Sequence, residues 1–345
     1  MFAAQELSTF DETLAIWVAE PHATKVSVND LGLEHQEALR EILTKVIATE
    51  IAKETYAQII EGLPLLRVFE DCFNVTKRED LTAHGHLSSD SIAILKKFKG
   101  NFNFDILQFD AKTARAYQNT TFDLREFKLR LLEMIAVACH KIAALLYKEV
   151  KGDAIPTERI LYQPPPITYP PSYDGTLRKP VARSPYLVLP TDFYHMSYQA
   201  MEQYPDGIAD VVGYWAELRI LGAWWCLIGG RVEKRFCKDA FLHPQPHQRM
   251  MHQLHDHQID QLVNFESVKK ESALDGVEII LPPLPFQNER YSRRLDEWDA
   301  LDQNIFRDMH ERRWDAPPPQ RCVRSGEDVP ELQDAIQKLR SEGQL

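Results

Sequence analysis

The sequence predicts a mostly helical α+β fold with a long-helix N-terminal half, a proline-rich strap and a mixed helix and hairpin C-terminal half. Apolar residues recur at helical spacing over long stretches of the first 151 residues. Prolines then crowd residues 152–190, where they exclude helix. Beyond residue 190, helical stripes alternate with strand-forming runs. The predicted regions are therefore 1–151, 152–190 and 191–345, which are also compatible with one continuous domain.

The N-terminal half is predicted to consist of helices. A short helix over 10–18 carries apolar residues three and four positions apart. Residues 33–60 keep the same spacing without an internal Gly or Pro, which predicts one long helix. A second long helix is predicted over 122–147, with Asp123 and Glu126 in its first turn, where acidic side chains complement the helix dipole. We expect the two long helices to pack together through their apolar stripes.

The middle of the chain is rich in proline and tyrosine. Nine of the 21 prolines lie between Pro156 and Pro190. Such a stretch prefers an extended polyproline conformation, and it suits a stiff linker, a ligand for a proline-recognising domain, or a strap across the surface. We favour the strap, because tyrosines alternate with the prolines and the apolar run 186–189 ends the segment.

The C-terminal half mixes helices and strands. A helix is predicted over 206–221, followed by a hairpin with strands over 223–228 and 231–236 around Gly229 and Gly230. A further helix is predicted from just after Pro246 to about residue 265. A short strand over 277–281 and a last helix after Asp328 complete the prediction.

The composition excludes several classes of protein. The chain has 345 residues, 40 Lys and Arg against 51 Asp and Glu, and a formal net charge of -11, so phosphate backbones would repel it. The longest apolar run, 220–230, is too short to span a membrane. No basic residue precedes Lys25, which argues against a secretory signal. The five cysteines are scattered, odd in number and without a CxxC pair, which argues against a disulfide framework and a cysteine-rich zinc site. We therefore predict a soluble, cytoplasmic protein that binds no nucleic acid.

Five histidines cluster within fifteen residues, at positions 243, 247, 252, 255 and 257. On one helix His252, His255 and Asp256 could approach a single metal ion. The alternative is a solvated helix face, with Met251, Leu254 and other apolar residues on the buried side. We favour the solvated face and predict no metal or other cofactor.

A second group of candidate residues lies between 191 and 219, where aromatic rings alternate with polar groups. Arg219 falls near Trp215 on the apolar face of the predicted helix, where an arginine is costly unless it is paired or holds an anion. Asp210, Tyr214 and Glu217 share the other side of this helix. Two interpretations stay open: an Arg–carboxylate bridge inside an ordinary core, or a lined pocket in which Arg219 anchors a ligand.

Segments 204–217 (YPDGIADVVGYWAE) and 306–312 (FRDMHER), the second followed by Arg321, Cys322 and Val323, resemble a group of uncharacterised stand-alone proteins common in filamentous fungi. The helix over 122–147 is also recognisable in that group, and the likeness covers most of the chain from about residue 120 onward. The group offers no agreed activity and no established catalytic residues. The chain departs from its pattern after Gly222, where two tryptophans and the histidine-rich segment replace a plainer strand.

Proteins of this group are sometimes encoded beside secondary-metabolite genes, in pathways that include cofactor-free cyclases of the Diels-Alderase type. The resemblance thus implies intramolecular cyclisation of a lipophilic terpenoid or polyketide. Such a reaction needs an aromatic-lined cavity and a hydrogen-bond donor that polarises a carbonyl. The predicted catalytic residues are Tyr194, His195, Tyr198 and Arg219, and the predicted substrate-binding residues are Tyr214, Trp215, Glu217, Trp224 and Trp225.

The sequence contains no nucleophile elbow, phosphate-binding loop, dinucleotide-binding loop or kinase signature. This absence fits a second hypothesis equally well: a binding or scaffolding protein whose proline-tyrosine strap and acidic surface recognise another protein. A metal-dependent enzyme built on the histidines is the third. An enclosed apolar pocket lined by residues 191–225 would favour the cyclase, and a solid core with an exposed groove would favour the binding protein. The sequence leaves homo-oligomer formation open.

Overall fold

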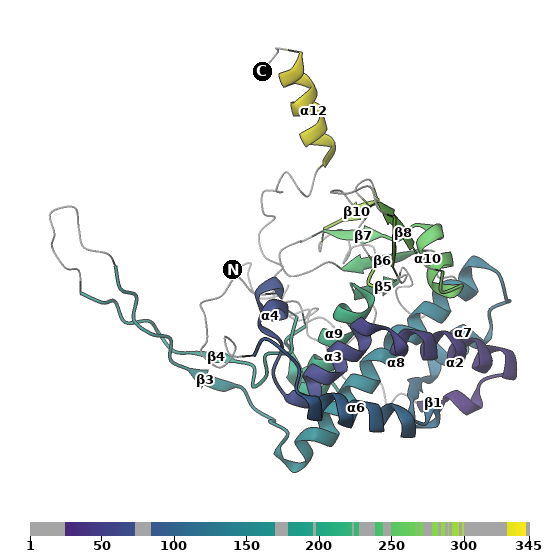
Figure 1. Ribbon diagram of the computed structural model, residues 1–345, viewed down its shortest axis with the longest axis horizontal. Helices are drawn as coiled ribbons and strands as arrows, with labels where there is room; N and C mark the ends of the chain where they lie inside the picture. Colours follow the sequence, from purple (N-terminus) through teal and green to yellow (C-terminus); the bar gives the residue numbers. More distant parts are fainter. Residues whose placement is uncertain are drawn as a thin grey trace, which may run out of the picture.

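The computed structural model describes residues 25–72, 84–169, 179–195, 198–222, 224–227, 239–243, 250–266, 268–271, 278–281, 284–286, 289, 292–296, 299 and 330–342. It confirms a mostly helical α+β fold (Figure 1). The helices of the described part are α2 (Leu33–Ala48), α3 (Glu50–Glu61), α4 (Leu66–Cys72), α6 (Ser89–Asn101), α7 (Ala111–Gln118), α8 (Arg125–Lys151), α9 (Ile208–Leu221), α10 (Asp256–Val263) and α12 (Pro330–Ser341). The predicted helix over 10–18 lies outside the described residues.

The strands form small antiparallel sheets. Three two-stranded sheets pair β1 (Lys25–Ser27) with β2 (Gln108–Asp110), β3 (Ile160–Tyr162) with β4 (Tyr186–Val188), and β8 (Val268–Glu271) with β9 (Glu278–Leu281). A four-stranded sheet has the order β10 (Arg294–Leu295), β7 (Met251–Gln253), β6 (Ala240–His243), β5 (Trp224–Leu227). Short 3₁₀ helices cover Val28–Asp30, Phe104–Ile106, Gly152–Ala154 and, as η4, Met201–Gln203.

The core of the molecule is the contact between α8 and α9 (Figure 1). α9 is buried at every position except Arg219, which is partly exposed. Gly222 ends α9 in the left-handed region at φ 84°, and a Cβ there would lie 2.3 Å from the carbonyl oxygen of Phe286. One apolar core continues from Val28 to Phe286. The N-terminal helices and the segment after the proline-rich region therefore share one interior.

The prediction of one helix over 33–60 is wrong in one respect, because the helix is interrupted at Thr49. Thr49 has extended backbone with ψ 152°, and its hydroxyl accepts a hydrogen bond from the Ala52 amide, 3.3 Å away. Threonine is a favoured N-cap residue, so it starts α3 where α2 ends. The apolar spacing continues across the break, which explains why the pattern suggested a single helix.

The second correction concerns the predicted helix from Pro246 to residue 265. Residues 251–253 form β7, and only Asp256–Val263 form α10. β7 pairs with β6 on one side and β10 on the other, so long-range strand pairing overrides the local helical spacing. The predicted return strand over 231–236 lies outside the described residues, and β5 pairs instead with β6. The predicted strand near residue 280 and the last helix are confirmed as β9 and α12.

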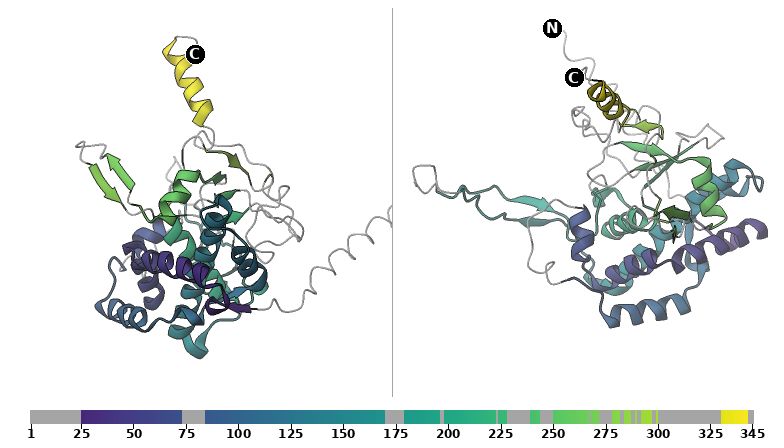
Figure 2. Two further views of the ribbon diagram at one scale, coloured as in Figure 1. Left: turned by 90° about the vertical axis from the view of Figure 1, so that its right-hand side faces the viewer. Right: turned by 45° about the horizontal axis from the view of Figure 1, so that its top comes forward.

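The proline-rich segment is extended, as predicted, but it does not lie across the body. β3 and β4 form a two-stranded ribbon that projects away from the helices (Figures 1 and 2). Leu161 pairs with Leu187, and further out Ile167 and Val181 exchange two backbone hydrogen bonds of 2.9 and 3.0 Å. We call the described residues 160–169 and 179–188 the β3–β4 arm.

α10 and the four-stranded sheet are fastened to the N-terminal end of α8 by ion pairs. The Arg125 guanidinium contacts Asp256 at 2.6 Å and Asp239 at 3.0 Å, and Lys128 contacts Asp260 at 2.6 Å. Within the described residues, no helix combines the length and apolar character needed to cross a membrane.

Candidate functional site

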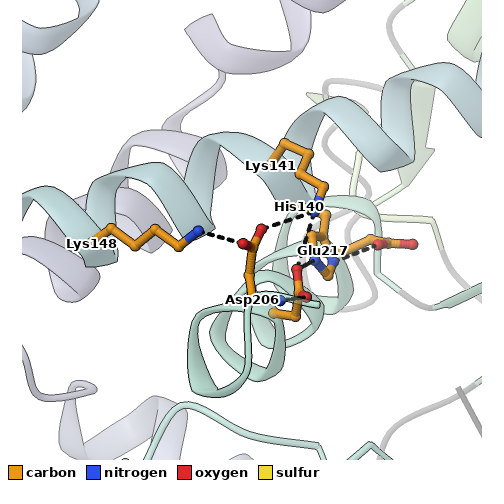
Figure 3. Close-up of polar contacts among 6 residues, drawn as sticks. His140, Lys141, Lys148, Asp206 and Glu217 are labelled. Carbon is orange, nitrogen blue, oxygen red and sulfur yellow. Dashed lines mark hydrogen bonds and ion pairs between the residues drawn. The ribbon is translucent and has the colours of Figure 1, made fainter. Parts of the chain in front are cut away.

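Three buried ionisable side chains meet where α8 crosses α9. His140 of α8 is 3% exposed, and its Nε2 donates a hydrogen bond to Asp210 Oδ1 at 2.9 Å. Its Nδ1 lies 3.8 Å from Glu217 Oε2. Asp210 and Glu217 are both buried on α9, two turns apart. Figure 3 shows the imidazole between the two helices. One ring nitrogen is hydrogen-bonded to Asp210 and the other faces Glu217, so the imidazole of α8 lies between two carboxylates of α9.

A glycine makes this contact possible. Gly213 lies on α9 between the two carboxylates in sequence, and a Cβ built on it would lie 2.6 Å from His140 Cδ2. Only a residue without a side chain leaves room for the imidazole against the helix.

Two lysines of α8 extend the cluster toward solvent (Figure 3). Lys141 Nζ lies 3.2 Å from Asp210 Oδ1 and 3.3 Å from Asp206 Oδ2, and Lys148 Nζ lies 2.6 Å from Asp206 Oδ1. The Asp206 amide donates to Asp210 Oδ2 at 2.8 Å. The exposure of these side chains rises from Asp210 to the lysines. The network therefore connects the core to the surface at the N-terminal end of α9.

The same contacts set the charge of the aspartates. Burial by itself would raise the pKa of Asp210, but the His140 hydrogen bond and the positive charges of His140 and Lys141 outweigh it and hold that pKa well below its usual range. For Asp206, burial also acts to raise the pKa, and the hydrogen bond from Lys148 with the nearby lysine charges lowers it. Both aspartates are thus held as carboxylates in the folded protein.

An aromatic layer covers the histidine. Tyr214 meets the His140 ring edge-on at 4.4 Å between centroids, and Tyr198 stacks on Tyr214 at 5.2 Å. Tyr204, which follows η4, meets Tyr214 at 5.1 Å. His195 lies 5.4 Å from Tyr198. These rings pack against one another in the interior.

The structure brings together most of the residues that we predicted for a cyclase pocket. His195, Tyr198, Tyr214, Trp215 and Glu217 are all buried in this region. Trp215 packs on Phe193 at 4.7 Å, and Tyr194 is partly buried at the edge of the core. The side chains contact other side chains, as in a packed core. Trp224 and Trp225 lie on β5, and their side chains are outside the described part of the structure.

Arg219 has a partner on a neighbouring helix. Its Nη2 lies 3.5 Å from Glu54 Oε1 of α3, and Glu54 also pairs with Arg67. This geometry matches the Arg–carboxylate bridge, the first of the two interpretations of the sequence. Arg219 therefore links α9 to α3.

The histidine-rich segment does not bring together His252, His255 and Asp256, the alternative ligand set, and it does not form one helix either. His252 is on β7 with its Nδ1 3.1 Å from Ser292 Oγ, whereas Asp256 is paired with Arg125. His255 and His257 both face Glu289, at 3.4 and 2.6 Å. Among the described residues, no group of three or more His, Cys, Asp or Glu side chains is arranged to hold a metal ion. An open pocket of about 370 Å³ lies here, lined by Arg125, Gln253, Leu254, His255, Asp256 and His257.

The second candidate site is on the surface of the β3–β4 arm. Eight of its large apolar side chains are between 41% and 65% exposed. They are Ile160, Leu161, Tyr162, Ile167, Tyr169, Val181, Tyr186 and Leu187. Tyr162 and Tyr186 contact each other across the strands at 5.5 Å, while Leu161 and Leu187 form the neighbouring pair of the register. Successive residues of a strand point to opposite faces, so both faces of the ribbon carry apolar groups.

Sequence reasoning missed His140. The helix over 122–147 was predicted, and so was the side of α9 that carries Asp210, Tyr214 and Glu217, but nothing in the local pattern joins the two. The usable signal was three polar groups on one side of an otherwise apolar helix, because such groups need a partner when buried. In comparisons with known protein families, curated proteins and solved structures, nothing matches this chain.

We expect Gly213→Ala to destabilise the protein by roughly 1–3 kcal/mol, although alanine is the better helix former, because the new methyl group overpacks against His140. The matched control is Gly100→Ala in the last turn of α6, where nothing lies within 4 Å of the added Cβ. The control should be neutral or gain up to about 1 kcal/mol. Urea unfolding gives the free energy of unfolding of both variants. Equal free energies of unfolding for the two variants would contradict the account.

The lowered pKa of Asp210 also predicts acid sensitivity. A group whose folded pKa is depressed stabilises the fold above its unfolded pKa, near 4, and this contribution is lost as the pH falls toward the folded value. Asp210→Asn should therefore lose about 1.5–3 kcal/mol at pH 7 and show a shallower loss of stability below about pH 5.

The control for removing a carboxylate as such is Asp90→Asn, at an exposed position in α6. Chemical denaturation between pH 7 and pH 3 gives the slope for each protein. An Asp210→Asn slope as steep as that of the wild type would sink this assignment.

Proposed function

We propose that the protein is a binding or scaffolding protein whose β3–β4 arm docks onto a protein partner. The observation that carries this proposal is the set of eight half-exposed apolar side chains on a projecting ribbon. Contiguous exposed apolar surface marks interaction sites in soluble proteins. A two-stranded ribbon is also only marginally stable in water, so a partner that covers its faces would stabilise it.

The base of the arm is held firmly on the body. Arg159 Nε lies 2.8 Å from Glu202 Oε1 of η4, and an Arg159 guanidinium nitrogen also donates to the Gln199 carbonyl. Leu189, directly after the arm, is buried in the core. A docking element that is fixed before binding loses less conformational freedom when the complex forms.

The prolines determine which part of the arm a partner contacts. Pro164, Pro165 and Pro166 lie on one side of the ribbon, and Pro180 and Pro185 lie on the other. Proline has no amide hydrogen and so cannot extend a sheet at these positions. At these positions a partner contacts the apolar side chains and the extended proline backbone, whereas β3 and β4 themselves contain no proline.

The cyclase hypothesis stays a prediction. It requires an enclosed apolar pocket lined by residues 191–225, and in the described part of that segment Tyr198, Tyr214 and Trp215 are buried against other aromatic rings. This packing is the solid core that the binding hypothesis expects, and the exposed apolar surface that goes with it lies on the β3–β4 arm rather than in a groove.

A photo-crosslinking residue at position 161 tests the proposal in the full chain. We expect it to form an adduct with one protein, whose purified form binds the wild type with a Kd in the micromolar range or lower. Leu161→Ser/Leu187→Ser should weaken that binding at least tenfold and leave the unfolding midpoint nearly unchanged, since both side chains are exposed.

The matched control is Ile92→Ser/Ile94→Ser on α6, where the two isoleucines are 52% and 51% exposed. It should bind like the wild type. Failure to form any protein adduct at position 161, or an equal loss of binding in the control, would refute the proposed function.

A further inference from the structure

We infer that the partner of the β3–β4 arm is a second copy of this chain, and that two copies exchange arms in a symmetric dimer. This inference rests on the proposed function and specifies it further. Three properties of the arm carry it: its charge, its apolar area and its direction.

The arm and the rest of the chain have opposite charge. The β3–β4 arm, residues 160–169 and 179–188, contains two basic residues, Lys179 and Arg183, and no acidic residue. The whole chain has a formal net charge of -11, so all of the acidic excess lies outside this segment. Complementary charge steers two surfaces together and favours the contact of an arm with the body of another copy over a contact between two arms.

The apolar area of one arm is that of one side of a stable interface. A large side chain has about 200 Å² of surface, so eight side chains that are about half exposed offer roughly 800 Å². Arm exchange about a twofold axis uses this surface twice. The dimer would then bury at least the roughly 1,600 Å² that is usual for specific complexes.

The direction of the arm prevents it from covering its own body. Figures 1 and 2 show β3 and β4 leaving the helices, and the nine residue steps from Ile160 to Tyr169 extend about 30 Å. That length is comparable to the size of a small domain, so the arm can reach across a neighbouring molecule. The buried Leu189 and the Arg159–Glu202 ion pair fix the starting point.

Sedimentation velocity of the purified full chain, from 1 to 100 µM, tests the inference. We expect a species of about twice 39.9 kDa whose dissociation constant rises with salt. Leu161→Ser/Leu187→Ser should raise that constant at least tenfold by removing apolar contact. Lys179→Glu/Arg183→Glu should also raise it, by reversing the charge of the arm. Ile92→Ser/Ile94→Ser should leave it unchanged.

Each outcome separates this inference from the proposed function. A wild type that stays monomeric at 100 µM, or a dimer that is insensitive to the arm variants, overturns the second-copy inference. If the residue at position 161 then crosslinks to a different protein whose binding depends on Leu161 and Leu187, the proposed function stands with another partner. If the chain is monomeric and no adduct forms, both fail.

Discussion

The structure depends on one contact, the insertion of His140 between Asp210 and Glu217 at the crossing of α8 and α9. Burying ionised groups costs roughly several kcal/mol for each charge unless geometry and hydrogen bonding are close to ideal. On the Asp210 side, the 2.9 Å hydrogen bond, the adjacent Lys141 and the space left by Gly213 offset this cost. A shift of either helix would leave a buried charge without its partner, so the network fixes how α8 and α9 pack.

A series of contacts connects the arm with the same site. Tyr214 covers His140, and Tyr204 packs on Tyr214 at the end of η4. Glu202 of η4 holds Arg159 at the base of the arm. The buried network, the aromatic layer and the arm thus form one continuous series of contacts. If the arm docks onto a partner, as we propose, such an anchor lowers the entropic cost of binding.

Local apolar patterns predicted most of the helices. The features that they missed depend on contacts between residues far apart in the sequence. The stripes over 122–147 and 206–221 predicted α8 and α9, because burial of one helix face leaves a regular trace in the sequence. The break at Thr49 escaped prediction, since the apolar spacing continues through it. β7 escaped because its conformation depends on pairing with β6 and β10. The contact between His140 and Asp210 joins residues 70 positions apart, which no local pattern records.

Hydrogen exchange at the arm tests the central claim most directly, namely that a protein partner covers the β3–β4 arm. The amides of Ile167 and Val181 hydrogen-bond only across the ribbon, where local opening governs their exchange. If a second copy covers the arm, their exchange should slow as the protein concentration rises from 1 to 100 µM, while amides in the middle of α8 exchange at a constant rate. Hydrogen exchange of these two amides at a rate that is independent of protein concentration and of any added partner would contradict the account.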